Sequence, residues 1–303
     1  MRARAAEGLL EELTSQLWPS STVSWSRMDE GLSNYNFTLN VDGRQFFAQV
    51  SEASEELGNL SASRTGRIAF TRRAEELNIG PAVVAAGERG DFTYLITEFG
   101  GKSLGALERP LTDEIVRKVG ESLGALHRSA PMPEPYSWAS HPIEGTLRFC
   151  NSISSRGPDV VNAIEMTREV SARVHELRGE FSVVPVHADL MPENILWDGE
   201  RVRLIDWEYS GMGDAVFDLA DFTAKNYLSE SMTAALVSGW GGVFEAVREI
   251  VIAYIPLSVL REAVWACRAD ELGWRPDVDY LGYAASRVSD ARASLEADGW
   301  PFG

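Results

Sequence analysis

The sequence of 303 residues has little cysteine, little positive charge and no long apolar run. Its two cysteines, Cys150 and Cys267, are too few and too far apart for a disulfide framework or a cysteine-based zinc site, which favours a reducing compartment. The longest apolar run, residues 251–260, is well short of the roughly 20 residues that span a bilayer. The N-terminal segment lacks the apolar centre of a signal peptide. We therefore predict a cytoplasmic protein with no membrane partner.

Basic residues are also scarce, with 28 Lys and Arg against 45 Asp and Glu, a formal charge of -17. This charge argues against a surface for nucleic-acid phosphates and favours cationic ligands, although acidity also keeps proteins soluble. Hydrophobic residues make up 45% of the chain and charged residues 24%, which is typical of a globular protein. Because the length is near the upper limit for one hydrophobic core, we expect two lobes.

Strand and turn signals dominate residues 1–98, after an amphipathic N-terminal helix. Asp42-Gly43 between two apolar segments indicates a hairpin, and a helix is predicted over 68–77, ending before Gly80-Pro81. The predicted strands are 22–25, 36–41, 45–50, 83–86 and 92–97. This part is therefore expected to be a small antiparallel sheet carrying one helix.

Helical signals dominate after Gly100-Gly101, so we place a lobe boundary there and divide the chain into 1–98 and 99–303. Thr112 is expected to cap the first helix of the second lobe. The longest helix is expected to kink or split at Pro256. Further helices are predicted at 160–178, 232–238, 243–267 and 280–297. The fold class is α+β, with a larger, mainly helical C-terminal lobe.

Three side chains with oxygen atoms follow short predicted strands in the second lobe: Asp189, Asn194 and Asp206. A hairpin around Asp198-Gly199 holds the last two at loop positions, where rigid scaffolds present chemistry. Phosphoryl transfer needs a carboxylate to orient the acceptor hydroxyl and oxygen ligands for Mg²⁺. Each residue alone is also explained as a cap, a turn residue or a surface charge. Their joint order favours the catalytic interpretation.

The segment HADLMPENILWDGERVRLIDWEYSGMGDAVFDLADF, residues 187–222, resembles the aminoglycoside phosphotransferase and choline kinase-like superfamily, most closely its choline and ethanolamine kinase-like members. The resemblance extends more weakly from Gly31 to Asp221. It implies a protein-kinase-like two-lobe fold that binds ATP and Mg²⁺. It also implies that Asp189 is the catalytic base, that Asn194 and Asp206 bind the metal, and that His187 and Asp218 brace the catalytic loop. His127 is interpreted as a packing residue.

The nucleotide side of the resemblance is less complete. Gly31, Ser33 and Asn34 lie in GLSNYNF, which resembles a phosphate-binding loop of the choline kinase type, although alone it also fits a hairpin turn. Glu98 and Phe99 occupy the interlobe position where the family binds the adenine edge through backbone groups. A plain linker is compatible with that role.

One position departs from the family. The strand over 45–50 is expected to carry a lysine or arginine for the phosphates, but the aligned residue is Gln49. Its usual helical partner, a glutamate, aligns near Arg67. We hypothesise that the positive charge has moved to the helix, so that Arg67 or Arg64 contacts phosphate. The alternative of a different class is a non-catalytic, pseudokinase-like protein that binds a nucleotide or metabolite.

The acceptor is predicted to be a small molecule with a hydroxyl group and a positive charge, as choline and ethanolamine have. Glu208 and Tyr209 in IDWEY match the choline kinase-like motif, and Asp214 and Asp221 are further acidic candidates. Lys225 stands where family members often have an acid, so an aminoglycoside or other antibiotic acceptor stays open. Aromatic candidates for a cation–π contact are Trp207, Tyr227, Trp240, Tyr254, Trp265 and Trp274. Oligomeric state and ATP against GTP preference are not predicted.

Overall fold

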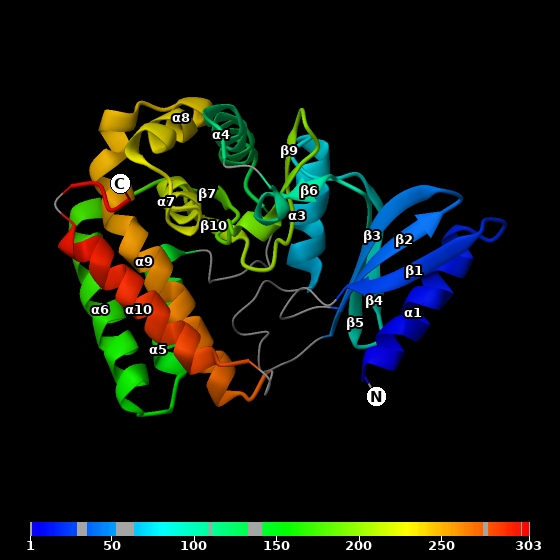
Figure 1. The fold of residues 1–303 in the computed structure, drawn as a ribbon, viewed down its shortest axis with the longest axis horizontal. Helices are drawn as coiled ribbons and strands as arrows, with labels where there is room; N and C mark the ends of the chain where they lie inside the picture. The colour runs from blue at the N-terminus through cyan, green and yellow to red at the C-terminus, as the bar shows by residue number, and fades with distance from the viewer. Residues whose placement is uncertain are drawn as a thin grey trace.

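The computed structural model describes residues 2–28, 35–52, 64–108, 111–132, 141–274, 278–297 and 299–302. A sheet lobe lies at one end of the molecule and a helical lobe at the other, with α3 (Arg64–Glu76) between them (Figure 1). The predicted α+β class with a small sheet lobe and a larger helical lobe is thus confirmed.

The sheet lobe is a five-stranded antiparallel sheet with strand order β1-β2-β3-β5-β4. Its strands are β1 (Val23–Met28), β2 (Tyr35–Val41), β3 (Arg44–Glu52), β4 (Val83–Arg89) and β5 (Phe92–Glu98). The predicted turn joins β2 to β3, because Asp42 and Gly43 adopt φ 50° and 86°, values that a tight hairpin requires.

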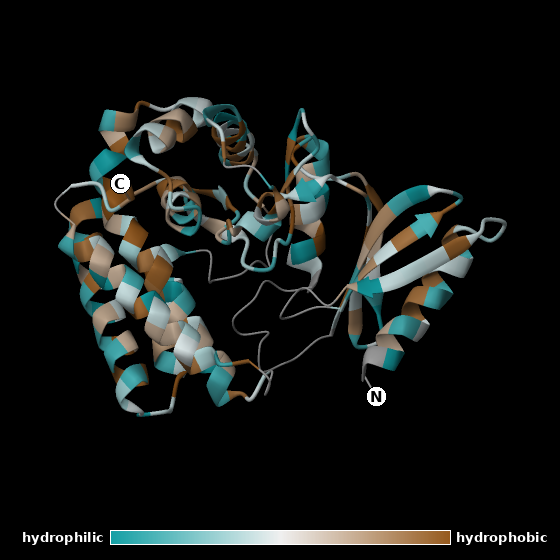
Figure 2. Ribbon diagram, in the orientation of Figure 1, coloured by the Kyte–Doolittle hydropathy of each residue, from teal (hydrophilic) through white to brown (hydrophobic). Residues whose placement is uncertain are grey.

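The helix α1 (Arg2–Leu17) covers this sheet with one face. Leu10 and Leu13 of α1 share a buried cluster with Phe37, Leu39 and Ile96 of the strands. Hydrophobic and hydrophilic residues mix along α1, as expected of a helix buried on one side only (Figure 2). Burial of each large side chain stabilises the lobe by about 2 kcal/mol.

The helical lobe is built around the long helix α9. Its helices are α4 (Asp113–His127), α5 (Pro142–Ser152), α6 (Pro158–Arg178), α7 (Ala215–Lys225), α8 (Glu230–Trp240), α9 (Phe244–Glu271) and α10 (Tyr280–Glu296). Thr112 caps α4 as predicted, because its side chain accepts the backbone N–H of Ile115 at 3.3 Å. The sequence did not predict α5 and α7 as helices: both are short, and the residues of α7 lie in the motif segment 187–222 and just beyond it.

Of the two outcomes expected at Pro256, a kink or a split, the split is wrong, because the helix runs unbroken from Phe244 to Glu271. Proline removes one hydrogen-bond donor, and packing of α9 against α6, α7 and α10 compensates for that loss. By length and composition α9 could cross a membrane, but 72% of its most apolar window is buried inside the protein. Its apolarity is therefore that of a core helix.

Short strands of the helical lobe hold the loops that carry the predicted site. β7 (Val183–Val186) pairs with β10 (Gly211–Asp214), and β8 (Ile195–Trp197) pairs with β9 (Val202–Leu204) on one side and with β6 (Lys102–Ser103) on the other. Two single-turn helices, η1 (Leu104–Ala106) and η3 (Pro192–Asn194), complete the connections. Phe70 and Ala74 of α3 pack into the core of this lobe, which anchors α3 next to these loops.

A backbone-to-backbone contact between α4 and α8 gives a stability prediction. A Cβ at Gly120 would overlap the carbonyl oxygen of Leu236, and neither helix backbone can move without disturbing the core. We expect Gly120→Ala to lower the free energy of unfolding by about 1 to 3 kcal/mol, measured by chemical denaturation. The matched control is Gly8→Ala on the exposed face of α1, where a Cβ meets nothing within 4 Å. At that position the same change is expected to raise the free energy of unfolding by about 0.5 to 1 kcal/mol. Equal effects at both positions would therefore contradict the predicted contact.

Candidate active site

The loop after β7 is held in place from several sides. Asp218 of α7 accepts hydrogen bonds from the backbone N–H groups of His187 and Ala188, each at 2.8 Å. Ala188 has φ 61°, a left-handed conformation that is uncommon for a residue with a side chain, so the turn depends on these bonds. His187 donates from Nε2 to the Ile205 carbonyl at 2.9 Å, and burial lowers the pKa of its imidazole, which keeps the ring neutral. The bracing by His187 and Asp218 that the resemblance implied is present.

His127 is a buried, hydrogen-bonded histidine, in line with the packing role expected for it. Its Nδ1 accepts the indole N–H of Trp240 at 2.9 Å, so its Nε2 is the donor and donates to Asp218 Oδ2 at 3.0 Å. His127 therefore also supports the carboxylate that holds the loop after β7. The sequence gives no signal for this contact, because His127 and Asp218 are 91 residues apart.

The three predicted oxygen-bearing side chains come together next to this loop. The Asn194 side-chain amide donates to Asp189 Oδ2 at 2.9 Å and to the Asp189 carbonyl at 3.0 Å. The Ile205 N–H donates to the Asn194 carbonyl at 2.9 Å, which places Asp206 directly beyond this junction. Asp206 has φ 60°, a second left-handed residue at the same place. Loop strain and polar side chains thus gather at one point.

Asp206 is held in an unusual electrostatic environment. Its Oδ1 is buried and accepts no hydrogen bond from the described residues. Burial and the neighbouring Glu208 carboxylate raise the pKa of Asp206 to about 7; Asp189 also raises it, and Arg67 lowers it. A buried carboxylate oxygen without a donor, next to other carboxylates, is well suited to a bound cation.

These residues fit Mg²⁺ bound together with a nucleotide. The described residues contain no cluster of three or more His, Cys, Asp or Glu side chains that could hold a metal by themselves. Asn194 and Asp206 offer one amide and one carboxylate oxygen, which are hard ligands. Magnesium ordinarily takes one or two protein ligands and completes its shell with phosphate oxygens and water. A two-residue site is therefore sufficient for it.

A cleft of about 460 Å³ opens between the sheet and the helical lobe beside Asp206. Phe47 and Leu95 line it from the sheet, and Leu196 and Leu204 line it from the opposite side. Asn194 and Asp206 lie in its wall. An apolar slot that ends at polar groups fits a planar base with a charged tail.

Glu98 and Phe99 border this cleft, as the sequence predicts. The backbone N–H of Glu98 donates to the Ala82 carbonyl at 2.9 Å, and that of Phe99 donates to the Gln45 carbonyl at 3.3 Å. The Glu98 carboxylate forms an exposed ion pair with Arg44. Because both N–H groups are engaged inside the protein, an adenine edge bound here would have to use carbonyl groups or the following glycines.

Gln49 and Arg67 are in direct contact. Arg67 Nη2 of α3 donates to Gln49 Oε1 of β3 at 3.2 Å, and the same nitrogen lies 3.8 Å from Asp206 Oδ1. The Arg67 side chain is only 15% exposed. A positive charge from the helix therefore stands beside the strand position where the family has its cation.

The other predicted nucleotide residues, Gly31, Ser33 and Asn34, lie outside the described residues, as does the side chain of Arg64. The glycine loop thus stays a prediction.

Of the acidic acceptor candidates, Asp214 is not part of the site. It caps α7 by accepting the Val216 N–H and also accepts hydrogen bonds from Arg178 and Tyr254, so its role is structural. Asp221 accepts the Leu190 N–H at 2.7 Å and so supports the loop after β7 from α7. Glu208 is 8% exposed and next to Asp206. The sequence could not separate these cases, because each acid lies in the same motif.

Several aromatic candidates are engaged in packing. Trp207 stacks on Phe70 with ring centroids 5.9 Å apart. Tyr254 donates to Asp214, and Trp240 donates to His127. Tyr227, by contrast, is 57% exposed and forms an edge contact with Phe302.

The sequence missed the ion pairs of Lys225. This residue ends α7, and its ammonium lies 2.7 Å from Asp189 Oδ1. Glu262 of α9, which the sequence did not single out, is 3.8 Å from the same ammonium. The unusual lysine was visible in the sequence, and a third partner, Asp221, is four positions away on the same helix, but Asp189 and Glu262 lie 36 and 37 positions away, in other elements.

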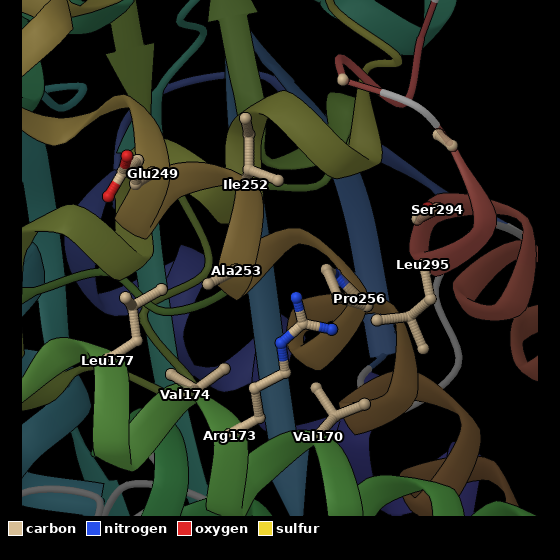
Figure 3. A pocket seen from close by; sticks show the side chains of 12 residues that line it. Val170, Arg173, Val174, Leu177, Glu249, Ile252, Ala253, Pro256, Ser294 and Leu295 are labelled. Atoms are coloured by element: carbon tan, nitrogen blue, oxygen red, sulfur yellow. The ribbon is translucent and has the colours of Figure 1, made fainter.

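A second cavity, of about 270 Å³, lies within the helical lobe between α6, α9 and α10 (Figure 3). Aliphatic side chains such as Val174 and Ile252 line it together with Glu249 and with Arg173, whose guanidinium group projects into the middle of the lining side chains (Figure 3). None of the predicted catalytic or nucleotide-binding residues belongs to its lining. The cleft next to Asp206 is therefore the candidate active site.

Curated relatives match parts of the chain. A LicA homolog of Metamycoplasma hominis is 28% identical over 139 residues, 46% of this chain and 53% of the relative. Protein LicA of Haemophilus influenzae is 44% identical over 55 residues, 18% of this chain and 21% of the relative. A homoserine kinase of Neisseria meningitidis serogroup B is 34% identical over 89 residues, 27% of this chain and 29% of that enzyme. The chain thus spans about half or less of the length of these relatives.

Solved structures share the whole fold. Choline kinase LicA from Streptococcus pneumoniae has a TM-score of 0.72 at 18% identity, covering 95% of this chain and 99% of that one. A choline/ethanolamine kinase family protein from Mesorhizobium loti has a TM-score of 0.70 at 19% identity, covering 96% of both chains. At these identities the likeness establishes the fold. In sequence, residues 24–250, about three quarters of the chain, match the Phosphotransferase enzyme family, and the protein is a member of that family.

Proposed function

We propose that this protein is an ATP- and Mg²⁺-dependent small-molecule kinase that transfers the γ-phosphoryl group of ATP to a hydroxyl of an amino-bearing or cationic acceptor of the choline or ethanolamine type. The observation that carries the proposal is that Asn194 and Asp206 line one interlobe cleft while Asp189 accepts a hydrogen bond from Asn194 and lies close enough to Asp206 to raise its pKa. The name of one structural neighbour, LicA in complex with AMP, supports an adenine nucleotide in this cleft.

The chemistry asks little of the protein beyond positioning and charge. The acceptor oxygen forms a bond to the γ-phosphorus while the bond from that phosphorus to the bridging oxygen of ADP breaks. Asp189 orients the hydroxyl and receives its proton. Asn194 and Asp206 would hold Mg²⁺, which when bound neutralises charge on the phosphate oxygens.

Arg67 would supply the cation that Gln49 does not provide. We expect Arg67→Ala to raise the KM for ATP by about 10-fold to 100-fold, because a charged hydrogen bond is worth roughly 1.5 to 3 kcal/mol. The measurement is steady-state kinetics with ATP varied at saturating acceptor. Arg72→Ala, an exposed arginine on the same helix, serves as the control and should leave this KM unchanged.

A second variant tests whether the positive charge works equally well on the strand and on the helix. Gln49→Lys combined with Arg67→Gln returns the cation to the strand and should recover most of the lost ATP affinity. An unchanged KM in Arg67→Ala would show that the charge has not relocated to this helix.

The acceptor class rests on the relatives and on charge. LicA is named a choline kinase in one solved structure, and homoserine, the substrate named for another relative, also carries an amino group and a hydroxyl. The net charge of -17 and the nearby Glu208 favour a positively charged partner. A thermostable mutant of the aminoglycoside phosphotransferase APH(4)-Ia is similar at a lower TM-score of 0.64 and 16% identity, so the antibiotic alternative is supported less well.

The test is turnover of the purified protein with MgATP against choline, ethanolamine, homoserine, thiamine and a set of aminoglycosides. Release of ADP and the added phosphoryl group are followed by a coupled assay and by mass spectrometry. Phosphorylation of an amino alcohol and not of an aminoglycoside is the expected result. Nucleotide binding without consumption on any acceptor would favour a non-catalytic binding protein. Gln49 and Arg67 motivate that alternative, and the contact of Arg67 with Gln49 weakens it, because it brings a positive charge to the strand position.

The predicted location is the cytoplasm, and nucleic acid and membrane remain predicted non-partners. Cys150 and Cys267 are both free and buried, which is consistent with a reducing compartment.

A further inference from the structure

A buried lysine, Lys225, lies next to Asp189, the residue proposed to orient the acceptor. Lys225 is only 6% exposed, and its ammonium lies 2.7 Å from Asp189 Oδ1, 3.3 Å from Asp221 Oδ1 and 3.8 Å from Glu262 Oε1. These carboxylates come from the catalytic loop, from α7 and from α9. We call Asp189, Asp221 and Glu262 the carboxylate cup. An ammonium inside the cup is fixed by three elements that pack together independently of any substrate.

The cup is itself held rigidly. Asp221 accepts hydrogen bonds from the Leu190 N–H at 2.7 Å and from the Ser258 hydroxyl at 2.6 Å. Glu262 accepts the phenolic O–H of Tyr283. Burial lowers the pKa of Lys225, but the carboxylates of the cup raise it by more, so the side chain remains an ammonium. The lysine is therefore a permanent positive charge in a defined position.

This ammonium provides the second hydrogen bond that holds the Asp189 carboxylate. Lys225 donates to Asp189 Oδ1, while the Asn194 amide donates to Asp189 Oδ2 at 2.9 Å. With both oxygens held, the carboxylate cannot rotate about its bond to the Cβ atom. A general base requires the acceptor hydroxyl within hydrogen-bond distance of a carboxylate oxygen whose orientation is fixed. Loss of that orientation lowers kcat more than it lowers the affinity for the substrate.

We propose that Lys225 is a positioning residue for phosphoryl transfer, whose ammonium fixes the plane of the Asp189 carboxylate and fills the carboxylate cup. The inference rests on the proposed function, since it presupposes that Asp189 orients the acceptor. It also restricts how the acceptor binds. Because the cup already contains a cation, the positive group of the acceptor binds on another side of Asp189, away from Asp221 and Glu262.

The experiment compares Lys225→Ala and Lys225→Met with the wild-type enzyme on the acceptor that the wild type phosphorylates. We expect kcat to fall about 100-fold in both variants, as for a small misplacement of a catalytic group, while the KM for ATP stays within about twofold. Added ethylammonium should restore part of the turnover of Lys225→Ala, with saturation, because the small cation can enter the vacated cup. It should not restore Lys225→Met, whose side chain fills that space.

Two controls separate this role from a structural one. Thermal unfolding reports whether each variant is folded, and Lys118→Ala on α4 reports any general effect of the amine on the assay. Near wild-type kcat in Lys225→Met would overturn the inference, and so would a loss in Lys225→Ala that ethylammonium leaves unrestored. Absence of turnover by the wild-type protein on every acceptor would instead contradict the proposed function.

Discussion

Asp189→Asn is expected to reduce phosphoryl transfer to near the detection limit while the protein stays folded. The substituted amide has almost the same shape, and its oxygen can still accept the hydrogen bond from Lys225. It cannot receive the hydroxyl proton, and general-base groups contribute about 10²-fold to 10⁴-fold to rate. We therefore expect kcat to fall by that factor, with little change in the KM for ATP.

The measurement is ADP release at saturating ATP and acceptor, together with a thermal unfolding curve for each protein. Glu200→Gln is the matched control, because it removes one carboxylate from the exposed turn between β8 and β9. That control should keep wild-type kcat. Turnover of Asp189→Asn within tenfold of the wild type would mean that another group orients the acceptor.

Asp206→Asn is expected to have opposite effects on activity and stability. It removes the only charged ligand proposed for Mg²⁺, so turnover should be lost at every Mg²⁺ concentration. It also removes a carboxylate whose charged form is disfavoured by burial and by Glu208, with its pKa raised to about 7. At pH 8, without nucleotide or metal, we expect the variant to be more stable than the wild type by about 1 to 2 kcal/mol, less than the full shift because the side chain is 26% exposed.

The sign of this effect can be tested by pH. A carboxylate with a raised pKa binds its proton more tightly in the folded protein than in the unfolded chain. Its contribution therefore lowers the free energy of unfolding as pH rises from about 4 to about 7. The stability advantage of Asp206→Asn should be present at pH 8 and should vanish near pH 4, as followed by denaturant unfolding at both values. An advantage that grows toward low pH would contradict the assigned environment.

The local elements could be predicted where their causes are local. Asp42-Gly43 produces its hairpin because both residues accept positive φ, and Thr112 caps α4 because its side chain reaches an N–H three positions ahead. Pro256 does not split α9, because the lost hydrogen bond is a local effect whereas the packing that compensates for it comes from distant parts of the chain. The helix is held by other helices, among them α6, α7 and α10, which a sequence window cannot show.

The meeting of the proposed catalytic residues could be predicted in part from the sequence. Asp189, Asn194 and Asp206 lie within 18 positions, and the hairpin between the last two brings their ends together, so their meeting follows from short-range structure. The roles of the other acidic residues in the same motif could not be predicted from short-range structure. Asp214 caps a helix and binds Arg178, whereas Asp221 supports the catalytic loop, and only packing against α6 and α9 separates these two outcomes.

The chain alone determined the chemistry that is available: which side chains carry oxygen, in what order, and on which short strands and turns they stand. The tertiary structure decided which charges meet. Arg67 reaches Gln49 across 18 positions, and Lys225 reaches Asp189 across 36, because helices from different parts of the chain pack against the same loops. Coulomb interactions fall off with distance in space and are independent of separation along the chain, so the pairing of buried charges depends on the folded arrangement of α3, α7 and α9.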